Sequence, residues 1–73
     1  MPCDEYPRLQ RKVQEALEIL TRLTEAQLSA FQRNDHSTFM RLDKELEQAV
    51  GAKERSIGAL RQHVKEHRCQ SFE

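Results

Sequence analysis

The sequence is poor in the residues that build aromatic cores and phosphate-binding loops. Its 73 residues include no Trp, one Tyr, three Phe, two Gly and two Pro. This content is too low for a large aromatic cluster, and the two glycines form no glycine-rich phosphate loop. No run of apolar residues approaches the ~18 that a membrane span requires. We therefore expect neither a phosphate-binding loop nor a membrane-spanning helix.

An excess of charge of one sign is also missing. Lys and Arg number 12 and Asp and Glu number 12, so the formal net charge is zero. A nucleic-acid-binding domain or a polybasic membrane anchor needs a cationic face, and the sequence predicts neither partner. Arg11 and Lys12 stand at helical spacing from Glu15, so we expect them to form ion pairs rather than a phosphate-binding patch.

The chain is short, and its start does not resemble a secretory signal. "MPCDEYPRLQ" has no basic segment followed by an apolar block. We therefore expect a cytoplasmic protein, in which the thiols of Cys3 and Cys69 are normally kept reduced. A single domain of this size has a thin core unless a disulfide, a metal or a partner subunit reinforces it.

Residues typical of long amphipathic helices dominate the composition, and their spacing predicts two such helices. In the first half, apolar residues recur at alternating steps of three and four, with Gln27 as the polar interruption, and a second apolar row runs beside them. In the second half the stripe is interrupted by Lys53 and Ser56. The predicted core or oligomer face consists of Val13, Leu17, Leu20, Leu23, Phe31, Phe39, Leu42, Leu46, Val50, Ile57, Leu60 and Val64.

A polar segment, "RNDHST", separates the two stripes. Asn34 tolerates the left-handed conformation that ends a helix, and Asp35 or Ser37 can cap the helix that follows. Asp4 is predicted to cap the first helix in the same way. The pattern predicts an all-α chain that forms one antiparallel two-helix hairpin.

The predicted bounds are about 5–33 for the first helix, 34–37 for the turn and about 38–68 for the second helix, within a single domain of residues 1–73. One unbroken helix, or a hairpin that exchanges helices with a second copy, is the alternative, since no Gly or Pro enforces the break. That rod would place Asn34 and Ser37 where apolar residues belong, so the hairpin is favoured.

A lone hairpin cannot bury both apolar rows. Two helices touch along one line, so the remaining Leu, Ile and Val side chains face water and forfeit part of their ~2 kcal/mol each. Two hairpins packed as a four-helix bundle cover both rows, which predicts a homodimer. Gly51 and Gly58 share one stripe of the second helix and either permit a close approach or are simply tolerated.

The open end of the predicted hairpin gathers potential metal ligands. Cys3 and Cys69 lie almost equally far from the turn, and His63 and His67 share a helical face at the spacing of a zinc-binding pair. These four residues could form a zinc site. Cys3 and Cys69 could instead form a disulfide worth about 4 kcal/mol. In the third interpretation the histidines are ordinary residues of a helix end, with His63 half-buried at the edge of the stripe.

The sequence predicts a protein without enzymatic activity, because no nucleophile stands with a base held by a third group. We expect a small interaction protein of adaptor or chaperone-like type that self-associates and binds a partner helix, without a cofactor. The alternative is a metal- or redox-responsive module built on the four residues at the open end. The spacing of leucines around the polar turn, over residues 9 to about 64, resembles small bacterial chaperone and adaptor hairpins such as the flagellar export chaperones. That resemblance implies a helical protein-binding role and assigns no residue.

Overall fold

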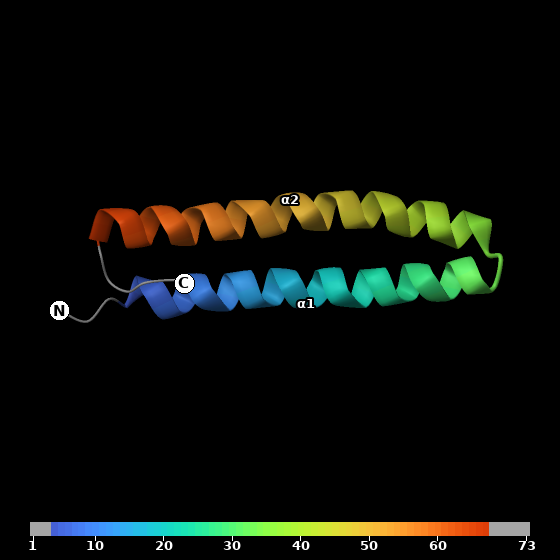
Figure 1. The fold of residues 1–73 in the computed structure, drawn as a ribbon, viewed down its shortest axis with the longest axis horizontal. Helices are drawn as coiled ribbons and strands as arrows, with labels where there is room; N and C mark the ends of the chain where they lie inside the picture. The colour runs from blue at the N-terminus through green and yellow to red at the C-terminus, as the bar shows by residue number, and fades with distance from the viewer. Residues whose placement is uncertain (1–3, 68–73) are drawn as a thin grey trace.

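The computed structural model describes residues 4–67, and for His67 the backbone alone. Two helices, α1 (Glu5–Gln32) and α2 (His36–His67), run antiparallel and pack against each other along their length (Figure 1). The hairpin measures 53 × 17 × 14 Å. The predicted two-helix fold is therefore confirmed, and the unbroken rod is excluded because the chain folds back after α1.

The turn ends α1 through its own backbone. Asn34 has a φ of 60°, the left-handed conformation predicted for it. The amide of Asn34 donates to the Phe31 carbonyl at 3.1 Å, and the amide of Asp35 donates to the Ala30 carbonyl at 2.9 Å. This pair of bonds is a Schellman motif, which satisfies carbonyls that the last turn of a helix leaves without a partner. The reversal of the chain is thus fixed locally.

Asp35 also begins α2. Its carboxylate accepts a hydrogen bond from the Thr38 amide at 3.2 Å, and the Arg33 guanidinium lies 3.6 Å away. Of the two residues predicted as caps, the structure therefore uses Asp35 rather than Ser37, and α2 begins two residues before the predicted start. The predicted side-chain cap at Asp4 is wrong. Asp4 has helical backbone angles, whereas a capping side chain normally needs an extended residue.

The two helices meet along one seam, whose members alternate at steps of three and four. This is the heptad spacing of a two-stranded coiled coil. The contact is therefore narrower than the two apolar rows of the first helix together. Each member is buried or half-buried, and Ala30 is completely enclosed. The seam consists of Tyr6, Leu9, Val13, Ala16, Leu20, Leu23, Gln27 and Ala30 of α1, with Phe39, Leu42, Leu46, Ala49, Lys53, Ser56, Leu60 and His63 of α2.

Gly51 and Gly58 lie away from the seam, five residues after Leu46 and Lys53. A Cβ atom at Gly58 would meet no atom within 4 Å, and one at Gly51 would meet only the flexible end of Arg55, at 3.4 Å. Gly51 and Gly58 therefore do not serve a close approach of α1 to α2 within one chain.

Neither α1 nor α2 contains a segment that is both long and apolar enough to span a membrane.

Replacing Asp35 should weaken the hairpin in a pH-dependent way. Hydrogen bonds from the Thr38 hydroxyl and amide, with the nearby charge of Arg33, hold the Asp35 pKa below its ordinary value of 3.8. Because the folded pKa is depressed, the stabilisation is complete above the unfolded pKa and is lost as the pH falls through the folded pKa. We expect Asp35→Ala to lower the urea midpoint at neutral pH, and the loss to shrink in acid.

Asp35→Asn is the matched control, since Asn caps helices about as well as Asp but carries no charge. Its midpoint at neutral pH should lie between those of the wild type and Asp35→Ala. Equal midpoints for the wild type and Asp35→Ala at neutral pH would contradict the assigned cap.

Candidate functional site

A polar residue inside the seam fixes the register of the two helices. The Gln27 side-chain amide donates to Asp43 Oδ1 at 3.2 Å and to the Phe39 carbonyl oxygen at 3.5 Å. Gln27, the one polar residue in the apolar stripe of α1, thus forms hydrogen bonds to α2. A half-buried polar group with specific partners opposes any other alignment, because sliding the helices would leave it unsatisfied.

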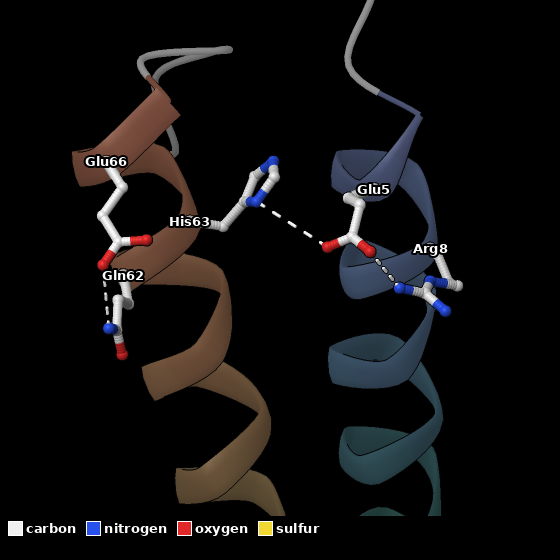
Figure 2. Close-up of polar contacts among 5 residues, drawn as sticks. All are labelled: Glu5, Arg8, Gln62, His63 and Glu66. Carbon is white, nitrogen blue, oxygen red and sulfur yellow. Dashed lines mark hydrogen bonds and ion pairs between the residues drawn. The ribbon is translucent and has the colours of Figure 1, made fainter.

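At the open end the seam closes on aromatic rings. Tyr6 is buried, and the His63 side chain is only 8% exposed. Figure 2 shows His63 pointing from α2 toward α1, with Nδ1 3.9 Å from Glu5 Oε1. The other oxygen of Glu5 pairs with Arg8. The expectation of a half-buried imidazole at the edge of the stripe is wrong, because rotation of α2 brings His63 into the seam.

Of the four residues proposed as metal ligands, the structure describes only the side chain of His63. Cys3 and Cys69 lie outside the described residues, as does the side chain of His67. Within residues 4–67, no cluster of three His, Cys, Asp or Glu side chains could hold a metal ion. The zinc site and the disulfide therefore stay predictions, and His63 serves the packing of the hairpin.

Beside the seam, α1 presents a second row of side chains to solvent. These residues stand one and four positions after the seam residues Tyr6, Val13, Leu20 and Gln27, and every one is exposed. We call this row the α1 strip. It consists of Pro7, Gln10, Gln14, Leu17, Thr21, Thr24, Leu28 and Phe31.

The α1 strip carries no charge, although a third of the chain's residues are charged. All the charged side chains of α1 lie at positions outside both the seam and the strip. The Thr21 and Thr24 hydroxyls donate to the carbonyls of Leu17 and Leu20, at 2.9 and 2.8 Å. With their hydroxyls occupied by the helix itself, these threonines can meet a neighbour through their methyl groups. The strip can therefore be buried without removing an ion from water.

Apolar side chains of α2 extend the same side of the hairpin. In an antiparallel pair, the positions four after Tyr6, Val13, Leu20 and Gln27 in α1 lie on the same side as the positions four after Phe39, Leu46, Lys53 and Leu60 in α2. Met40 and Val50 are exposed, whereas Ile57 and Val64 are half-buried. We call the α1 strip together with these four residues the apolar face.

Most of the exposed large apolar side chains of the described hairpin belong to this face. Phe31 is 64% exposed and Leu28 is 56% exposed, and Leu17, Met40 and Val50 follow. Ile19, which is 45% exposed, lies on the opposite side. The hairpin therefore covers one of the two predicted apolar rows and leaves the other open on a single face.

The residues of the predicted core or oligomer face divide accordingly. Leu17, Phe31 and Val50 are exposed on the apolar face, and Ile57 and Val64, which belong to the same face, are half-buried. The predicted set did not include Leu28 and Met40, which are also exposed on the apolar face. Leu28 stands three residues before Phe31, a spacing that places both on one side of a helix. The remaining predicted residues belong to the seam: Val13, Leu20, Leu23, Phe39, Leu42, Leu46 and Leu60.

The apolar face has two hollows. A shallow groove of about 700 Å³ runs along α1 and is lined by Tyr6, Val13 and Leu60 of the seam, by Gln10, Gln14, Leu17 and Thr21 of the α1 strip, and by the charged Glu18 and Arg22. A smaller hollow of about 280 Å³ lies at the turn and is lined by Ala30, Phe31, Asn34, Asp35, His36 and Phe39. At the turn, the Phe31 ring lies tilted against Phe39, with ring centroids 5.8 Å apart, and most of its surface remains exposed.

Comparison of the chain with protein-family models, curated proteins and solved structures found no match.

Zinc should leave the thermal stability of the protein unchanged. The His63 imidazole is buried in the seam with Nδ1 facing Glu5, and packing between the helices accounts for this position without a metal. We expect thermal midpoints measured by circular dichroism to agree with and without zinc, and Cys3→Ser to behave like the wild type.

A specific site filled at a hundred times its dissociation constant would add about 2.7 kcal/mol to the free energy of unfolding. A stabilisation of this order that Cys3→Ser abolishes and the turn variant His36→Ala retains would contradict our expectation. It would favour the metal-responsive module instead.

Proposed function

We propose that this chain is a non-enzymatic interaction protein of adaptor or chaperone-like type that self-associates through the apolar face into a four-helix bundle. The observation that carries the proposal is the position of the exposed large apolar side chains, of which Leu17, Leu28, Phe31, Met40 and Val50 share one side of the hairpin. Scattered apolar residues are normal on a protein surface, whereas a contiguous apolar face marks a site of association.

The energetics of a small chain support the same proposal. A domain of this size buries a limited share of its apolar surface. Here part of the seam itself is polar, because Gln27, Lys53 and Ser56 occupy positions that aliphatic residues fill in a stable coiled coil. Packing a second hairpin on the apolar face adds the burial that the single seam lacks.

The proposed adaptor role follows from the same surface. An amphipathic helix of another protein binds a groove through apolar side chains spaced at three and four residues. A partner helix of this kind would compete with the second copy for the apolar face. The cytoplasmic location expected from the sequence stays a prediction.

A charge placed on the apolar face should dissociate the assembly. We expect Leu28→Glu to weaken the dimer at least about 100-fold, because burying an unpaired carboxylate costs roughly 3 kcal/mol or more. Sedimentation velocity should show a dimer for the wild type and a monomer for Leu28→Glu. Circular dichroism of the same samples would report whether the variant remains helical.

Ile19→Glu is the matched control, because Ile19 is similarly exposed but lies on the opposite side of the hairpin. It should sediment as the wild type does. A wild-type protein that is a folded monomer at all concentrations would contradict the proposal, and so would equal weakening of the dimer by both variants.

A further inference from the structure

We propose that the second copy binds in one particular arrangement: the two α1 helices pack antiparallel across a twofold axis near Thr21. Leu28 and Phe31 of each copy then enter the open-end groove of the other. This inference rests on the proposed self-association and adds its surface, its orientation and its register.

The first support is the shape of the apolar face. Its most exposed apolar side chains, Phe31 and Leu28, stand at the turn end. Its larger groove runs from the open end to the middle of α1, with apolar walls at Tyr6, Val13, Leu17 and Leu60, and Glu18 and Arg22 also line it. A twofold axis that lies in the interface, perpendicular to the helices, places the turn end of one copy against the open end of the other. The exposed Leu28 and Phe31 of each copy then meet the groove of the other. An isologous interface requires a surface that complements itself in this way.

The second support is the distribution of charge. The α1 strip is uncharged along its whole length, whereas α2 carries Asp43, Glu47, Glu54 and Arg61 on the same side. Centring the interface on α1 buries the uncharged strip against its own copy and leaves these charges at the rim. Polar rims around an apolar centre are the usual organisation of protein interfaces.

The available area fits a second hairpin. One long side of the molecule measures 53 × 17 Å, or about 900 Å². A standard interface buries about 800 Å² on each partner. A second copy covering this side therefore needs no additional element to reach the size of a stable dimer.

The register follows from the positions of the protrusion and the groove. Leu28 lies seven residues after Thr21, and Gln14, on the groove wall, lies seven residues before it. At 1.5 Å per residue each is about 10 Å along the helix from Thr21. Placing the axis at Thr21 therefore sets Leu28 of one copy against Gln14 of the other and brings the two Thr21 residues together.

Cysteine pairing tests this arrangement in the full chain. In a background in which Cys3 and Cys69 are replaced by Ser, single variants Thr21→Cys, Gln14→Cys and Leu28→Cys are oxidised under mild conditions. We expect Thr21→Cys to form a disulfide-linked dimer by itself. A mixture of Gln14→Cys and Leu28→Cys should yield predominantly the mixed disulfide, which mass spectrometry distinguishes from either homodimer. Arg11→Cys, at an exposed charged position outside the strip, serves as the control that should stay monomeric.

The crosslinking pattern tests the antiparallel arrangement, and sedimentation tests separately whether the protein dimerises. Leu28→Cys pairing preferentially with itself would show parallel hairpins or another register and overturn this inference, as would efficient pairing of Arg11→Cys. If sedimentation still shows a dimer in either case, the proposed function stands. A monomeric background protein without crosslinks in any variant would overturn both.

Discussion

The structure depends on a mismatch between the apolar surface of the two helices and the width of their contact. Each helix carries apolar residues on two adjacent rows, but one helix packed on one other can bury only a narrow stripe of each. The seam from Tyr6 to Ala30 is satisfied within the chain, and the strip beside it is not. The α1 strip is therefore the surface of the hairpin on which a second copy or a partner helix can pack.

The hairpin itself is fixed at a few positions. The left-handed Asn34, the cap at Asp35 and the bond from Gln27 to Asp43 all lie in the half of the molecule near the turn. They determine where the chain reverses and how the helices align. In the opposite half, aliphatic and aromatic residues pack around the half-buried Lys53 and Ser56, and the seam ends at the buried Tyr6 and His63.

Sequence reasoning predicted the helices and the turn because their signals are local. Spacing at three and four residues needs only a helix, and Asn34 followed by Asp35 needs only a turn. It did not predict which apolar row forms the seam, since that depends on the rotation of one helix about its axis relative to the other. The same rotation places His63 inside the contact and Phe31 outside it. The absence of charge along the α1 strip was visible in the sequence, but its meaning appears only once the seam is located.

The most direct measurement of the central claim is the urea midpoint of the wild-type chain over a roughly hundredfold range of protein concentration. If the open apolar face is closed by a second copy, folding is coupled to association, and the midpoint must rise as the concentration rises. A midpoint that is independent of concentration, with full helicity in the most dilute sample, would show that the single hairpin is sufficient by itself and would contradict the account.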